Sequence, residues 1–93
     1  MHYIVVAYDI TDDARRLQVA KVLEDFGTRV QKSVFECLLG DRDLVRLQDR
    51  LRRIIDESTD SVRFYRQCRR CQKAIEVLGR GPSTLESEDI LIV

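Results

Sequence analysis

One acidic residue, Asp9, stands where the chain could carry out metal-dependent chemistry. It directly follows the nearly continuous apolar run 3–8, which is typical of a strand buried on both faces. The end of such a strand holds a carboxylate rigidly while still exposing it to solvent. Mg2+ prefers oxygen ligands and keeps several waters, so one or two carboxylates suffice to bind it. Asp9 is therefore a candidate metal ligand, and a cap of the following turn is the alternative interpretation.

A second copy of the chain would double the number of carboxylates at this site. At 93 residues the chain has room for one domain, and a domain this small is often marginal as a monomer. A two-fold axis places the same patch of both subunits at their interface, so two Asp9 side chains could share one ion. Asp12 and Asp13 lie nearby, although acids also stabilise the first turn of a helix.

Basic residues near Asp9 and in the C-terminal third are candidates for binding phosphate, because a planar guanidinium engages two oxygens at once. The formal net charge is zero, which excludes nucleic-acid binding by bulk charge and leaves binding by a basic face. Arg15 and Arg16 follow Asp9 closely along the chain, and Arg29 and Lys32 lie on or near the next predicted strand. The C-terminal group is Arg66, Arg69, Arg70 and Lys73.

A further basic stripe recurs along a predicted helix at steps of three and four residues. The favoured interpretation is a solvated face whose charges are paired with nearby aspartates. The arginines are Arg42, Arg46, Arg50 and Arg53, and the aspartates are Asp43, Asp49 and Asp56.

The cysteines include one C-x-x-C pair, Cys68 and Cys71. A structural zinc site normally needs four ligands, and the other candidates, Cys37 and His2, stand at no recognised spacing. Reduced cysteines packed at the end of a strand are the simpler interpretation. A four-cysteine site made from this pair in two subunits is the alternative. The odd number of cysteines does not indicate a disulfide framework.

Hydrophobic periodicity predicts the elements that would position these side chains. The run 3–8 predicts a strand, and the apolar stripe from Val19 to Phe26 predicts a helix that Gly27 ends in a left-handed conformation. Residues 28–39 favour two short strands with a reversal at 31–33. Residues 41–55 have the clearest helical periodicity, and 61–68 and 74–78 favour strands. The order is that of a ferredoxin-like βαββαβ α+β sandwich, with helices on one face of an antiparallel sheet.

The remainder of the chain has a different character. We expect residues 1–80 to form the ferredoxin-like domain, and 81–93 to be a linker followed by a C-terminal strand. The apolar end Ile90–Val93 needs a sheet edge, either that of its own chain or that of a partner subunit. No apolar run is long enough to span a bilayer and no secretory signal is evident, so the chain is expected to be cytoplasmic and not membrane-bound.

Three segments in this order resemble the CRISPR-associated Cas-two family. They are Val6–Ile10 with the arginines that follow it, Gly27–Glu36 and Asp60–Tyr65, and the resemblance covers residues 1 to about 78. It implies a ferredoxin-like homodimer, often with C-terminal strands that cross to the partner. It also implies work with dimers of the adaptation integrase during spacer acquisition, and metal-dependent endonuclease activity on RNA or double-stranded DNA.

The resemblance also implies roles for individual residues. Asp9 corresponds to the family's strand-end aspartate, a catalytic ligand of Mg2+ with Mn2+ as an alternative. Arg15, Arg16 and Arg29 correspond to its basic residues, and Phe35 corresponds to its strand phenylalanine, a supporting residue.

Several functions fit these observations. The first is a nuclease that uses paired Asp9 carboxylates and Mg2+. The second, favoured here as the biological role, is a non-catalytic dimeric scaffold that grips DNA, with hydrolysis incidental. A toxin-type RNA interferase of the same fold is a further alternative, and a regulatory dimer for a small ligand fits the elements but not the motifs.

Overall fold

The computed structural model of the chain describes residues 1–79 and 91–92. Four antiparallel strands form a sheet in the order β2-β3-β1-β4, with one helix in each of the two crossovers. The elements are β1 (His2–Asp9), α1 (Asp13–Glu24), β2 (Gly27–Gln31), β3 (Val34–Leu39), α2 (Asp41–Arg52) and β4 (Ser61–Gln67). This topology confirms the predicted ferredoxin-like α+β fold. No helix in the described part of the chain is both long and apolar enough to cross a membrane.

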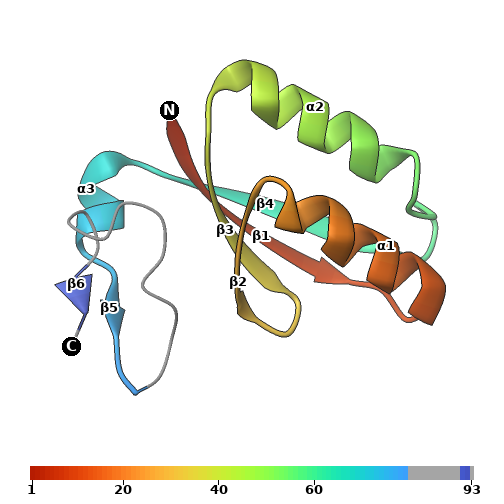
Figure 1. Cartoon of the computed structure of the whole chain (residues 1–93), viewed down its shortest axis with the longest axis horizontal. Coiled ribbons are helices and arrows are strands. Elements are labelled where there is room, and N and C mark those ends of the chain that lie inside the picture. The colour runs from red at the N-terminus through yellow and green to blue at the C-terminus, as the bar shows by residue number, and fades with distance from the viewer. Residues whose placement is uncertain (80–90, 93) are drawn as a thin grey trace.

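The core lies between the sheet and its two long helices. Alternate residues of β1, namely Ile4, Val6 and Tyr8, belong to the buried cluster, as a strand's period of two requires for one face. Leu23 of α1 and Leu47 of α2 are fully buried in the same cluster. Figure 1 shows the two helices side by side over the sheet. The other face of the sheet has neither of these helices on it.

The connection between β2 and β3 is a two-residue reversal at Lys32 and Ser33, as the polar interruption predicts. The prediction for Gly27 is wrong, because Gly27 begins β2 and does not adopt a left-handed conformation. A side chain is excluded there by close packing. A Cβ atom would lie 2.3 Å from the carbonyl oxygen of Glu36 and 2.5 Å from Sγ of Cys37.

The second helix is shorter than its apolar periodicity predicts. It ends at Arg52, where the chain turns, and Ile54 and Ile55 pack against the core from the loop that follows. Apolar spacing therefore extends past the helix because the loop also contributes to the core.

The segment after β4 was only partly predicted. Where the sequence favoured cysteines at a strand end, a short helix α3 (Arg69–Lys73) begins, and β5 (Glu76–Val77) follows it. The strand β6 (Leu91–Ile92) pairs in parallel with β5 of its own chain. Exchange of this strand between subunits stays a prediction, and the predicted linker lies outside the described residues.

Candidate metal and phosphate site

Asp9 ends β1 opposite Ser61 of β4, and its side chain is exposed. Beside it lies a shallow hollow of about 240 Å3, lined by Tyr8, Asp9, Ile10, Arg16, Lys32 and Ser33. Three separate elements therefore contribute to its wall: the end of β1, the first turns of α1 and the β2–β3 reversal. Tyr8 holds the reversal in place, because its N–H donates to the Ser33 carbonyl at 3.1 Å and its hydroxyl donates to the Lys32 carbonyl at 3.2 Å.

The Asp9 carboxylate has no hydrogen-bond or ion-pair partner among the described residues. The turn-cap interpretation does not hold, because the cap of α1 is Asp12, which accepts from the Arg15 N–H at 2.9 Å. All other aspartates within 1–79 have a polar partner. They are Asp12, Asp13, Asp25, Asp41, Asp43, Asp49, Asp56 and Asp60.

Arg16 lies beside Asp9 and is oriented by the backbone. Its Nη1 donates to the carbonyls of Ile10 at 3.2 Å and Thr11 at 3.4 Å, and its Nη2 pairs with Asp13. These contacts fix the guanidinium at the start of α1. Arg16 lines the hollow at Asp9, and it also lines a neighbouring hollow of about 250 Å3 together with Arg29 and Lys32.

Arg29 reaches this neighbouring hollow from β2. Its guanidinium carbon lies 5.3 Å from the centroid of the Phe35 ring, within the range of a cation–π contact. Phe35 itself is fully buried, so its contact with solutes is indirect. The Phe35 ring therefore packs against the Arg29 side chain, and its predicted supporting role in function stays a prediction.

Arg15 is committed to a different partner. Its Nε donates to Asp60 Oδ2 at 2.8 Å and its Nη2 donates to Asp60 Oδ1 at 3.3 Å. Asp60 also accepts from the backbone N–H of Asp56 at 2.9 Å. The Arg15 guanidinium lowers the pKa of Asp60, and the same hydrogen bonds raise the pKa of Arg15. Arg15 therefore ties α1 to the segment before β4, and its contact with phosphate stays a prediction.

The C-terminal basic group lies at the other end of β1. Arg66 faces Ile4, which lies about 17 Å along the strand from Asp9. Arg69 and Arg70 follow in α3, which Figure 1 places beyond that same end of the sheet. One chain thus brings Asp9, Arg16, Arg29 and Lys32 together, and keeps Arg66, Arg69 and Arg70 apart from them.

Two arginines of the predicted stripe, Arg46 and Arg50, form salt bridges, as does the neighbouring Arg52. Arg46 pairs with Asp43 at 3.1 Å and Arg52 pairs with Asp49 at 3.3 Å. Arg50 reaches across to Asp25, the C-cap residue of α1, at 3.1 Å. Of the predicted stripe, Arg46 therefore has one of the predicted aspartate partners, whereas Arg50 pairs with Asp25 instead. Arg52 lies outside the predicted stripe, so the predicted pairing is confirmed for Arg46.

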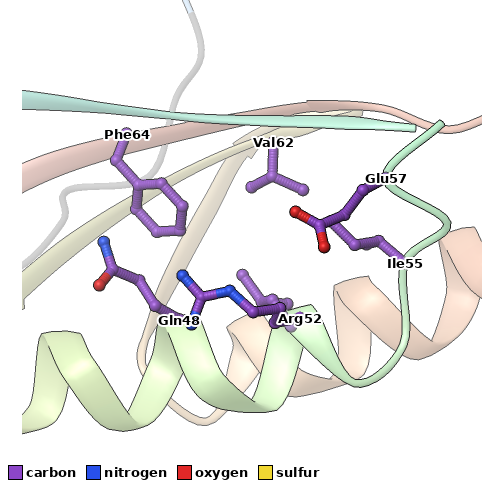
Figure 2. Close-up of a pocket in the computed structure, with 7 residues that line it drawn as sticks. Gln48, Arg52, Ile55, Glu57, Val62 and Phe64 are labelled. Carbon is purple, nitrogen blue, oxygen red and sulfur yellow. The ribbon is translucent and has the colours of Figure 1, made fainter. Parts of the chain in front are cut away.

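A second kind of hollow lies between α2 and β4, away from the predicted site residues. Figure 2 shows Val62 and Phe64 pointing from β4 toward Gln48 and Arg52 of α2, with Glu57 at the rim. Its lining is mainly apolar, and it contains one carboxylate. No residue predicted to do chemistry lies in it.

The described residues contain no cluster of three or more His, Cys, Asp or Glu side chains that could hold a metal ion. Cys37 is fully buried and His2 contacts Asp41 at 2.6 Å, so neither joins the C-x-x-C pair. In the hollow at the end of β1, the described part of one chain therefore offers a metal the single carboxylate of Asp9. No pattern along the chain indicated that Tyr8 lines the hollow, because Tyr8 has the pattern of an ordinary core residue of the strand.

Comparison with known proteins places this arrangement in a family. Residues 1–75 match the family described as CRISPR associated protein Cas2. A Chloroflexus aurantiacus relative, named CRISPR-associated endoribonuclease Cas2 1, is 45% identical over 92 residues, which are 98% of this chain and 99% of the relative. The crystal structure of Streptococcus pyogenes Cas2 covers 83% of this chain and 99% of its own, with 41% identity and a TM-score of 0.74.

A larger solved assembly contains a similar chain. The structure is described as a partial Cas6-RT-Cas1–Cas2 complex, and the match covers 80% of this chain and 87% of that one at 31% identity, with a TM-score of 0.69. The family match, the relatives and the shared fold agree: this chain belongs to the CRISPR-associated protein Cas2 family.

Proposed function

We propose that the chain acts with the adaptation integrase in CRISPR spacer acquisition, and that it cleaves nucleic acid with Mg2+ through Asp9. The observation that carries the nuclease proposal is the unpaired Asp9 carboxylate, exposed at a rigid strand end beside Arg16 and Lys32. The names of two similar proteins support the proposed role in spacer acquisition and nucleic-acid cleavage. A relative is named an endoribonuclease, and a similar chain occurs in an assembly whose description includes Cas1.

The carboxylate oxygens of Asp9 are suitable ligands for a hard cation such as Mg2+. Asp9 offers carboxylate oxygens that no described group of the protein uses, and Mg2+ prefers oxygen ligands. A bound Mg2+ would polarise the scissile phosphodiester and lower the pKa of a bound water. One chain supplies one such carboxylate, so the proposal requires two chains that bring their Asp9 residues together.

The exposed face of the sheet supports a homodimer of this kind. Val5 and Ala7 alternate with the core residues of β1, so they share the face opposite the helices with Asp9. Leu38 of β3 is opposite Tyr3 in the register, and Tyr65 of β4 is 46% exposed. A two-fold contact through this partly apolar face would place the two Asp9 side chains at a common interface.

The basic residues around Asp9 would hold the substrate. Arg16 and Lys32 line the hollow at Asp9, and Arg29 extends the positive surface across β2. Phosphate oxygens bind well to guanidinium and ammonium groups, and positive charge beside the scissile phosphate stabilises the charge that develops during cleavage. The chain's own contribution is thus to bind and orient the backbone of RNA or DNA against Asp9.

The scaffold function is the second candidate, and one observation favours it. The hollow contains no histidine and no carboxylate besides Asp9, so it provides no separate general base. Cleavage would then be slow, and the dimer would serve mainly to hold DNA for its integrase partner.

The test compares wild type with Asp9→Asn and, as a matched control, Asp43→Asn, an exposed aspartate paired with Arg46. Cleavage of RNA and double-stranded DNA is measured in Mg2+, Mn2+ and EDTA, and spacer acquisition is measured in cells. We expect Asp9→Asn to slow metal-dependent cleavage by at least about 100-fold and Asp43→Asn to leave it unchanged. Titration with Mn2+ should show one ion per two chains.

The outcomes separate the hypotheses. Undiminished metal-dependent cleavage by Asp9→Asn would show that Asp9 is not the metal ligand. Loss of cleavage together with normal acquisition would identify the chain as a scaffold in that pathway. Cleavage of RNA by a chain that does not support acquisition would favour an RNA interferase.

A further inference from the structure

The C-x-x-C pair has a geometry that the proposed function does not use. Cys68 precedes α3 and Cys71 lies in its first turn, and their sulfur atoms are 3.2 Å apart. The backbone N–H of Cys71 donates to Sγ of Cys68 at 3.3 Å. Both side chains are exposed and both thiols are free. Two accessible sulfurs in contact are therefore held together by the local fold.

The two thiols differ from each other and from Cys37. The pKa of Cys68 is lowered, first by the hydrogen bond from the Cys71 N–H and then by the Cys71 side chain. The Cys68 sulfur in turn raises the pKa of Cys71. Burial raises the pKa of Cys37 to about 11. Because the thiolate is the nucleophile, Cys68 is suited to attack first, Cys71 to attack second, and Cys37 to remain inert.

A metal site fits the same atoms less well. Two thiolates on a tetrahedral zinc ion, at a Zn–S distance of about 2.3 Å, would stand roughly 3.8 Å apart. The observed separation is 3.2 Å, and no third His, Cys, Asp or Glu joins the pair among the described residues. The contact is shorter than shared ligation requires, and closing it to a disulfide requires only a small movement of the two side chains.

We propose that Cys68 and Cys71 form a redox-active dithiol that exchanges with small-molecule disulfides. The Cys68 thiolate attacks one sulfur of the small disulfide, which releases one small thiolate and leaves a mixed disulfide on Cys68. Cys71 loses its proton to water and attacks Sγ of Cys68, which releases the second small thiolate. The two cysteines thus give up two electrons and two protons, and one small disulfide becomes two thiols.

The ring that closes would enclose Arg69 and Arg70. These residues belong to the C-terminal basic group, so the oxidation state would constrain the backbone that carries them. The proposal about the thiols stands apart from the nuclease proposal, since neither cysteine lines the hollow at Asp9.

The experiment uses the full chain with oxidised glutathione and an aromatic disulfide as probes, and reads the products by intact mass. In wild type we expect the loss of two hydrogens and no attached glutathione. Cys71→Ser should keep one glutathione on Cys68, because the second attack is missing. Cys68→Ser should react at least about 10-fold more slowly, because Cys71 lacks the same hydrogen bond. Cys37 should react with the aromatic disulfide only after denaturation.

Three results would overturn the proposal. Equal rates for Cys68→Ser and Cys71→Ser would remove the asymmetry between the thiols. Glutathione that stays on the wild-type chain, or chains linked to each other on a non-reducing gel, would show that the pair does not close on itself. Zinc that survives dialysis against EDTA and blocks the reaction would identify a metal site. Circular dichroism of each serine variant checks that the fold is retained.

Discussion

The two ends of β1 use charge in opposite ways. At the end that carries Asp9, the neighbouring ions are fixed by several partners, as in the contact of Arg15 with the buried Asp60. At the other end, charges such as Asp41 and Arg70 lie on exposed surfaces. An ion pair in solvent contributes little, whereas a buried charge depends strongly on its partner. The two ends therefore differ in how deeply the paired charges are buried, since the Asp60 carboxylate is fully buried whereas Asp41, although paired with His2, is exposed.

The largest expected change in thermal stability comes from the Arg15–Asp60 pair, at the end of β1 that carries Asp9. Asp60→Asn removes the charge that faces Arg15 and leaves the guanidinium beside a buried amide, with only the more distant Asp12 carboxylate at 3.9 Å. We expect the midpoint of thermal unfolding to fall by about 5–10 °C. Asp43→Asn, which breaks an exposed pair with Arg46, should shift it by less than about 2 °C. Equal shifts in calorimetry would mean that the two kinds of pair do not differ.

The same variant has a defined pH signature. Arg15 lowers the pKa of Asp60 in the folded chain, so folding favours the ionised form. This contribution is complete above the ordinary pKa of an aspartate and disappears as the pH falls through the lowered, folded-state pKa. Wild type should therefore lose stability on acidification below about pH 4, and Asp60→Asn should lose less. Parallel losses in both proteins would remove Asp60 as the source.

Local patterns predicted the elements whose signals are themselves local. The apolar run of β1 and the 3.6-residue period of α2 each lie within one segment. β1 formed where expected, and α2 began where expected although it ended earlier, at Arg52. The helix α3 has five residues, too few to show a period, and a cysteine caps it in place of the usual Ser, Thr, Asp or Asn. Its absence from the prediction follows from these two features.

The candidate site was predictable in part for a related reason. Asp9 stands out because it follows a buried strand, which is a local feature. The commitment of Arg15 to Asp60 joins residues 45 positions apart, and no pattern along the chain distinguishes Arg15 from its neighbour Arg16. Which aspartate stays unpaired is likewise a property of the whole fold, because the partners of other aspartates, such as Asp60 and Asp25, lie far away in the sequence.

Substitutions of arginines at the two ends of β1 are expected to have intermediate effects, and they separate nucleic-acid binding from cleavage. Arg16→Gln and Arg29→Gln should each reduce the slope of log affinity against log salt by about 1, and should also slow cleavage, because these residues flank Asp9. Arg69→Gln and Arg70→Gln should reduce the salt slope without changing the rate of cleavage at saturating nucleic acid. Arg15→Gln should leave the slope unchanged, because its guanidinium is held by Asp60.

Filter binding over a range of salt concentrations, together with single-turnover cleavage, measures both quantities. An unchanged slope for Arg69→Gln and Arg70→Gln would confine phosphate contact to the Asp9 end. A reduced cleavage rate at saturation for the same variants would show that the two ends act on one substrate position, which would contradict their separation along β1.

The smallest expected change in stability comes from the Asp41–His2 pair, at the end of β1 opposite Asp9. Asp41 contacts His2 at 2.6 Å, yet 86% of the Asp41 side chain is exposed. The His2 ring lowers the pKa of Asp41, so this contact also favours folding above the ordinary aspartate pKa and is lost on acidification. Because water screens the pair, Asp41→Asn should shift the unfolding midpoint by less than about 2 °C and leave cleavage unchanged. A loss as large as that of Asp60→Asn would show that exposure does not decide how much a charge pair contributes here, and the contrast between the two ends of β1 would have to rest on Asp9 alone.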